Sequence, residues 1–243
     1  MTKKLLELFS GTHSIGKVLH NKGYEVYSLD RDLGGTNGDY TSTNHFKVDI
    51  LTWDYKQFPK GYFDLITASP VCATWSAMRR TWIGRISKTL RPQGGKVTKQ
   101  DLEDRINEDG KPMVDKIFEI INYFEPDNWW IENPQTGSMK FYIESEYPEF
   151  NTYYDFDYCK YTNWGYQKKT RFWTNIEDIT PLKCKKDCDN MIVGTKVHKT
   201  RIGISKVIRE RNEKLGMNMN QNMIERYRIP EKIIEVLVKN KSY

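Results

Sequence analysis

Phe63-Asp-Leu-Ile-Thr-Ala-Ser-Pro-Val-Cys-Ala-Thr-Trp-Ser76 is the stretch from which the fold can be worked out. Its first half, Phe63 to Ala68, is a short apolar run typical of a parallel strand buried on both faces. Pro70 breaks the run, so that a lone cysteine, Cys72, follows just beyond the expected carboxyl end of the strand. Open α/β sheets bind ligands at this edge, and nearby positive charge there would favour a nucleophilic thiolate. The alternative is that Cys72 is a small buried hydrophobic residue.

The segment that follows the cysteine is strongly basic. Residues 77–100 carry seven basic residues and no acidic one, and Gly84, Gly94 and Gly95 make this loop flexible. A second basic stretch, residues 160–214, carries a net charge of +8, so the rest of the chain has a net charge of −9. An acidic body with two basic patches suits a polyanionic partner such as nucleic acid, although charge runs are also common on solvated surfaces. The basic residues of the loop are Arg79, Arg80, Arg85, Lys88, Arg91, Lys96 and Lys99.

Other apolar runs predict that strands and helices alternate along the chain. Such alternation implies right-handed crossovers and an α/β fold with a doubly wound, mostly parallel sheet. Residues 101–111 are charged and turn-prone, and Met223 to Lys239 is predicted to be helical around Ile229-Pro230. The other predicted strands are 4–9, 24–30, 46–49, 128–133 (ended by Pro134), 151–158 and 170–174, and the other predicted helices follow residues 10–16 as far as Gly23 and cover residues 113–124.

Composition limits the class of protein. The chain of 243 residues is long enough for one α/β domain with a small appendage, and no apolar run approaches the length of a membrane span. Four scattered cysteines are too few for a disulfide framework. We expect a soluble monomer in the cytoplasm of a bacterium or a virus-infected host cell.

Polar residues recur in order at the predicted strand ends. They are Phe9-Ser-Gly-Thr, Asp30, Asp49, Cys72, Glu132-Asn133 and Gln167-Lys-Lys-Thr-Arg171. In this order they resemble the motifs of the cytosine C5 DNA methyltransferases, in particular the compact members carried by phages. The resemblance runs from residue 5 to about residue 239. It implies a methyltransferase fold of the Rossmann-like type, with S-adenosylmethionine as cofactor, DNA as substrate, and a role such as that of a restriction-modification enzyme.

The resemblance assigns cofactor-binding residues. The loop after the first strand would approach the methionine part of the cofactor, with His13 and Ser14 in place of the family's usual glycine pair. Asp30 would accept hydrogen bonds from the ribose hydroxyls, and Asp49 with Ile50 would hold the adenine. Either acid could instead be a helix cap. The cofactor-binding set is Phe9, Ser10, Gly11, Thr12, His13, Ser14, Asp30, Asp49, Ile50 and Pro70.

The same resemblance assigns catalytic residues. Cys72 would attack carbon 6 of cytosine, although Val71 stands where the family has a second proline. Glu132 would hydrogen-bond ring nitrogen 3 and the exocyclic amine, with Asn133 ordering the loop. Arg171 and Lys169, which replaces the family's first arginine, would contact the base or its phosphate.

Cytosine must leave the helical stack to be methylated at carbon 5. The basic loop, with Arg79, Arg80 and Arg85, would close over the flipped nucleotide together with Lys168, and Trp75 or Trp82 would fill the gap in the duplex. The resemblance divides the chain into a catalytic core (1–175), a small target-recognition insert (176–220) and a C-terminal helix returning to the core (221–243). So small an insert implies a short or relaxed recognition sequence.

Cys184, Cys188 and His198 lie within the insert and are candidate zinc ligands, with Cys159 as a candidate fourth. The alternative is a pair of free thiols and a surface histidine.

Three other functions stay open at this level. The catalytic set also allows an RNA cytosine-5 methyltransferase. Ser69-Pro-Val-Cys72 distantly resembles the Ser-Pro-Pro-Tyr of amino-methyltransferases, but it lacks their aromatic residue. A catalytically silent DNA-binding relative would explain the altered glycine loop and the small insert.

Overall fold

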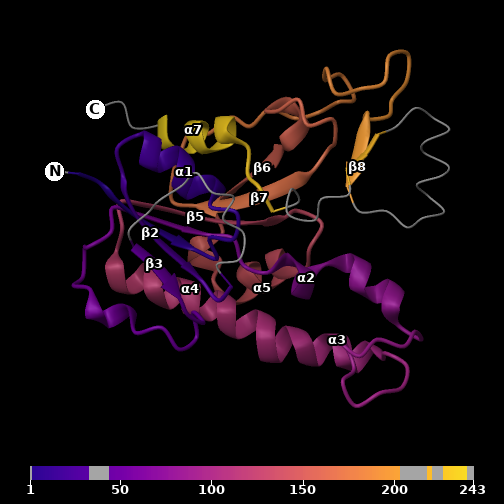
Figure 1. The fold of residues 1–243 in the computed structure, drawn as a ribbon, viewed down its shortest axis with the longest axis horizontal. Helices are drawn as coiled ribbons and strands as arrows, with labels where there is room; N and C mark the ends of the chain where they lie inside the picture. The colour runs from indigo at the N-terminus through magenta and orange to yellow at the C-terminus, as the bar shows by residue number, and fades with distance from the viewer. Residues whose placement is uncertain (1, 33–43, 203–217, 221–226, 240–243) are drawn as a thin grey trace.

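The computed structural model describes residues 2–32, 44–202, 218–220 and 227–239. A seven-stranded sheet crosses the middle of this part (Figure 1). It consists of β1 (Lys4–Leu8), β2 (Glu25–Asp30), β3 (Asn44–Lys47), β4 (Leu65–Ala68), β5 (Asn128–Pro134), β6 (Tyr153–Asp157) and β7 (Lys169–Thr174). The order is β3-β2-β1-β4-β5-β7-β6. β7 runs antiparallel to both of its neighbours, β5 and β6, and the other adjacent pairs of strands are parallel. This confirms the predicted mostly parallel sheet.

Helices cover both faces of the sheet, as expected for a doubly wound fold (Figure 1). One face carries α1 (Ser14–Asn21) and α7 (Glu231–Lys239), and the other carries α4 (Lys111–Phe124) and α5 (Met139–Glu146). The apolar residues of α4 recur at helical spacing and form one buried stripe against the sheet. They are Val114, Ile117, Phe118, Ile121 and Phe124. Each face of the sheet therefore has its own apolar core.

Short elements connect these layers. They are α2 (Cys72–Trp75), the 3₁₀ turns η1 (Tyr55–Gln57), η2 (Ala77–Trp82), η4 (Pro148–Phe150) and η5 (Tyr158–Lys160), and a small parallel pair of strands, β8 (Thr200–Ile202) and β9 (Asn218–Asn220). None of the helices in the described ranges is both long enough and apolar enough to cross a bilayer.

The prediction that residues 101–111 form turns is wrong. They belong to α3 (Lys99–Arg105) and to the π-helical turn η3 (Ile106–Gly110), which runs directly into α4. A capping box starts α3, because Thr98 and Asp101 exchange side-chain-to-backbone hydrogen bonds. The Asp101 carboxylate accepts hydrogen bonds from the Thr98 hydroxyl (2.6 Å) and from the Thr98 backbone N–H (2.7 Å), and in that order they lower the pKa of Asp101 to about 2. Charged pairs four residues apart, such as Arg105 with Asp109, support a helix that carries few apolar residues.

The predicted C-terminal helix is too long. Residues 223–226 lie outside the described ranges, residues 227–230 are not helical, and α7 starts at Glu231. Pro230 precedes the helix, where its carbonyl oxygen accepts a hydrogen bond from the Ile233 backbone. The Ile229 backbone N–H donates to the Ser14 hydroxyl (3.1 Å), which ties this end of the chain to α1. The ends of the strands differ from the predicted ends by up to about two residues. β5 includes Pro134 as its last residue.

Candidate functional site

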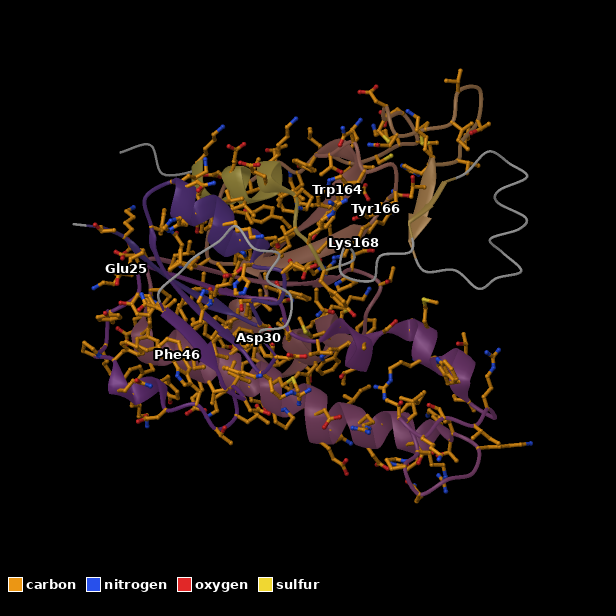
Figure 2. The ribbon with its side chains drawn as sticks, in the orientation of Figure 1. Glu25, Asp30, Phe46, Trp164, Tyr166 and Lys168 are labelled. Atoms are coloured by element: carbon orange, nitrogen blue, oxygen red, sulfur yellow. The ribbon has the colours of Figure 1, made fainter. Side chains whose placement is uncertain are left out.

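A cavity of about 1190 Å³ lies where β1, β2, β4 and β5 end. Figure 2 shows that Asp30 marks the end of β2 nearest the centre of the molecule, whereas Glu25, at the start of the strand, lies at the periphery. Parallel strands bring their carboxyl ends to one edge, so the polar residues that follow them meet there. The cavity lining includes Phe9, Ser10, Gly11, Thr12, Ser14, Asp30, Asp49, Ile50, Pro70, Cys72, Arg79, Glu132 and Lys168.

The loop after β1 forms one wall of this cavity. Phe9, Gly11 and His13 all have positive φ angles, and the Gly11 backbone N–H donates to the Asp30 carboxylate (2.9 Å). His13 is the one member of the predicted loop that the lining does not include. Its side chain is fully buried, with Nδ1 3.7 Å from Glu7 Oε2. The imidazole that replaces a family glycine is therefore buried beside Glu7 and is not part of the cavity lining.

Glu7 is a structural residue that sequence reasoning missed. Its carboxylate is buried within β1 and accepts hydrogen bonds from the Gly16 backbone (3.1 Å) and the Ser28 hydroxyl (3.2 Å). A buried acid needs such partners because desolvation otherwise makes its charge very costly. The available signal was an acidic residue inside an apolar strand. Glu7 thus fixes the start of α1 beneath the loop.

Two carboxylates line the same region of the cavity. Asp30 accepts a further hydrogen bond from the Asp32 backbone N–H (2.8 Å), and Asp49 accepts one from the Leu51 backbone N–H (3.0 Å). Each bond joins residues two apart in the chain, as expected if the two acids were only capping residues. Both acids nevertheless line the cavity as well.

The Cys72 turn is held from two sides. The Asn133 side-chain amide donates to the Pro70 carbonyl oxygen (3.0 Å), as predicted for a residue that orders the loop. Behind the turn, the Trp75 carbonyl oxygen accepts from the Ser138 backbone N–H (2.9 Å). Gly110 packs so closely that a Cβ atom there would lie 2.9 Å from the Trp75 ring. These contacts fix where half-buried Cys72 enters the cavity.

Trp75 cannot fill a gap in DNA as predicted, because only 3% of it is exposed and it stacks on Tyr142 in the core. Trp82 is 43% exposed and lines the cavity, so of the two tryptophans it is the accessible one.

Glu132 lies at the end of β5 and is 6% exposed. Its Oε1 lies 3.3 Å from Lys168 Nζ and accepts from the Tyr158 hydroxyl at 3.4 Å. Burial, and secondly the Glu132 charge, raise the pKa of Tyr158 well above its ordinary value, so that tyrosine remains a donor. The carboxylate is thus held between one cation and one hydroxyl, at the edge of the cavity.

Lys169 and Arg171, which were predicted to contact the base, do not line the cavity beside Glu132. Lys169 is exposed and lies outside the cavity lining drawn from the described residues. Arg171 makes two hydrogen bonds to Asp155 (2.8 and 3.0 Å) and stacks over the Tyr153 ring, 3.4 Å from its centroid. Lys168, which precedes β7, is the basic residue that reaches Glu132 (Figure 2 labels it).

Of the three arginines predicted to contact nucleic acid, one lines the cavity and two do not. Arg79 lines the cavity and donates to the Thr74 carbonyl oxygen (2.7 Å), whereas Arg80 and Arg85 are exposed outside the lining. Sequence reasoning missed Lys186 and Lys196, which belong to the predicted insert and line the cavity as well. Residues 203–217 of that insert and 221–226 of the predicted C-terminal helix lie outside the described ranges.

The predicted metal ligands do come together. One ligand atom from each of Cys159, Cys184, Cys188 and His198 lies within 4.8 Å of the others. Cys159, which the sequence offered only as a candidate fourth ligand, is part of this cluster.

No family model matches the chain. A curated protein of Frog virus 3 (isolate Goorha), named "Probable DNA (cytosine-5)-methyltransferase", is 37% identical over 192 residues, which cover 77% of this chain and 78% of the viral protein.

Two solved structures are more distant. A prophage-encoded protein of E. coli is 13% identical (74% of this chain, 51% of that chain, TM-score 0.47). The Dnmt2 methyltransferase of S. pombe is also 13% identical (75% and 52%, TM-score 0.44). This chain spans about half the length of each of them.

Proposed function

Because this chain belongs to the DNA (cytosine-5)-methyltransferase family, we propose that it transfers a methyl group from S-adenosylmethionine to carbon 5 of cytosine in DNA. The observation that carries the proposal is that Cys72, in the turn after β4, and Glu132, near the end of β5, line one cavity. The Asn133 to Pro70 hydrogen bond joins the end of β5 to the Cys72 turn. A nucleophile and a carboxyl group held this way can act on one base.

The cavity suits S-adenosylmethionine next to a nucleobase. Its volume, about 1190 Å³, exceeds the roughly 300–1,000 Å³ of an ordinary single-ligand pocket. Asp30 and Asp49 would bind the ribose and the adenine, and the backbone from Phe9 to Thr12 would approach the methionine part. When bound, the cofactor supplies an electrophilic methyl group on a sulfonium sulfur.

The residues of this chain would then activate the base. The Cys72 thiolate forms a bond to carbon 6 of cytosine, which makes carbon 5 an electron-rich enamine carbon. The Glu132 carboxyl group shares a proton with ring nitrogen 3 and accepts from the exocyclic amine, so it offsets the charge that develops on the ring. Once carbon 5 carries the methyl group, its proton would pass to water, and the electrons of that carbon–hydrogen bond would re-form the ring double bond and expel the Cys72 sulfur as a thiolate.

The base would have to be flipped out of a duplex to reach Cys72. Arg79 and Trp82 line the cavity beside this turn and would contact the flipped nucleotide and the gap it leaves. A short or relaxed recognition sequence fits the small insert at residues 176–220.

Nucleoside analysis tests the proposed function. DNA duplexes, single strands and RNA would be incubated with the protein and with cofactor carrying a deuterated methyl group, and the digests examined by mass spectrometry. We expect deuterated 5-methylcytosine in DNA. Label in 5-methylcytosine from RNA alone, or in N4-methylcytosine, would replace the proposal with one of its alternatives. Absence of label despite DNA binding would favour a silent DNA-binding protein.

Asp30→Asn should weaken S-adenosylmethionine binding by about tenfold or more, because a neutral amide loses a charge-assisted hydrogen bond to the ribose. The variant also weakens the bond that holds Gly11. Isothermal titration calorimetry would measure the change, with Asp54→Asn, at an exposed acid outside the described cavity lining, as a matched control. Equal affinity in both variants would remove Asp30 from the cofactor site.

A further inference from the structure

A cluster of three thiols and one imidazole lies where η5 meets the segment that follows β7. Cys159 comes from η5, and Cys184, Cys188 and His198 come from the loop that leads to β8. Cys159, Cys188 and His198 are buried, and Cys184 is half-buried. Sulfur and imidazole side chains gathered this way form a ligand set suited to zinc.

The three distances among Cys184, Cys188 and His198 match a tetrahedral ion, and the Cys159 sulfur lies within 4.8 Å of each of these ligand atoms. A tetrahedral Zn²⁺ with Zn–S bonds of about 2.3 Å and a Zn–N bond of about 2.0 Å holds its sulfurs about 3.8 Å apart and its S···N pairs about 3.5 Å apart. Cys184 Sγ lies 3.7 Å from Cys188 Sγ, and these two sulfurs lie 3.6 and 3.4 Å from His198 Nε2. A disulfide would require sulfurs only about 2.0 Å apart. We infer that Cys159, Cys184, Cys188 and His198 bind one structural Zn²⁺ ion, which fixes residues 181–200 as a wall of the catalytic cavity.

Burial explains why this segment needs an ion. From residue 180 to residue 200, all of which are described, the buried residues are Cys188, Asn190 and His198. Two of these three are ligands, so the segment buries almost no apolar surface of its own. Asn190 adds hydrogen bonds from its amide to the Cys159 and Thr162 carbonyl oxygens (2.8 and 2.7 Å). Zinc would stabilise the segment in place of a hydrophobic core.

Backbone hydrogen bonds join the segment that carries three of the ligands to the elements around it. The Cys184 backbone N–H donates to Asp157 (2.8 Å), and the Thr200 backbone N–H donates to the Gly165 carbonyl oxygen (2.8 Å). Gly165 has a φ of +85°, and a Cβ atom there would clash with the Thr200 hydroxyl. His198 itself lines the cavity, so the ion would lie directly behind the wall.

The positions of two cavity-lining lysines depend on the fold of this ligand-bearing segment. Lys186 and Lys196 flank the ligands and line the cavity, and Lys186 Nζ donates to Gln167 (2.9 Å). If DNA is the substrate, as the proposed function states, these amines would contact its phosphates. The ion would therefore support DNA binding while taking no part in methyl transfer.

Metal analysis of the purified full chain tests the site itself. Inductively coupled plasma mass spectrometry should find about one zinc per chain, and Co²⁺ substituted for zinc should give the intense visible bands of a tetrahedral thiolate site. Cys188→Ser should lose most of the metal, whereas Cys72→Ser, at a cysteine outside the cluster, should keep it. A wild-type protein that binds neither ion after exposure to excess metal would overturn the site, whatever the variants do.

DNA binding tests the role of the wall. With zinc bound, Lys186→Ala/Lys196→Ala should weaken binding to a fluorescent duplex by about tenfold in anisotropy titrations, because two phosphate contacts are lost. Lys185→Ala, at an exposed lysine of the same segment outside the described cavity lining, is the control. Unchanged affinity in the double variant would overturn the role. The zinc content is independent of the substrate, so it stands even if the proposed function fails.

Discussion

Cys72→Ala should transfer methyl groups to DNA at least about a thousandfold more slowly than the unaltered protein. Without the thiolate, carbon 6 gains no nucleophile, and carbon 5 of cytosine stays too electron-poor to take a methyl group. Arg79 and Lys168 line the same cavity as Cys72. Single-turnover incorporation of labelled methyl groups would measure the effect, because it separates chemistry from product release.

Covalent trapping identifies the bond that Cys72 forms. In DNA with 5-fluorocytosine, fluorine replaces the proton that must leave carbon 5, so the carbon–sulfur bond should persist in denaturant. We expect this complex with the wild-type protein and not with Cys72→Ala. Cys72→Ser, which keeps the size of the side chain, should bind cofactor and DNA normally and serves as the folding control. Full activity in either variant would contradict the carbon-5 mechanism and favour methylation of the exocyclic amine.

Glu132→Gln should lower the rate of methyl transfer by about 10²- to 10⁴-fold, the range typical of a lost acid–base group. The amide has the same shape as the carboxyl group but cannot share a proton with ring nitrogen 3. It also leaves Lys168 Nζ, 3.3 Å away, without its carboxylate partner. The loss should appear in kcat more than in KM, because the interaction strengthens as charge develops on the ring. Steady-state kinetics on a fixed duplex would measure both constants.

Adjacent lysines provide the matched comparison for Glu132. Lys168→Ala removes the cation that faces the carboxylate and should lower activity, whereas Lys169→Ala, at an exposed side chain, should retain more. If Glu132→Gln keeps its activity while both lysine variants are normal, Glu132 is a structural partner of Lys168 and Tyr158 rather than part of the chemistry.

Much of the sheet follows from sequence patterns alone. Short apolar runs that end at polar residues correctly predicted the strands, and Cys72, Asp30 and Glu132 all lie at the cavity edge. The predicted turns at 101–111 failed because a capping box and ion pairs support a polar helix there, and these do not produce an apolar stripe. The C-terminal helix was predicted too long because helical periodicity does not reveal where the helix begins.

Side-chain direction could not be predicted in the same way. The sequence places Lys168, Lys169 and Arg171 in one motif, but Lys168 faces Glu132 while Arg171 faces Asp155. The His13 imidazole is buried beside Glu7, a residue that no motif singled out, and is not part of the cavity lining. Trp75 was predicted as a possible DNA contact, and this is wrong because it packs against Tyr142 and Gly110 in the core.

The sequence by itself determined the doubly wound architecture, the edge at which the site lies and the residue types available there, because strand periodicity and chain order are local properties. Tertiary structure alone decided which basic residue meets Glu132, and that Cys159 joins three ligands 25 to 39 residues away in the chain. Such contacts depend on how separate segments pack, and side chains that are neighbours in sequence can face opposite sides of the same strand.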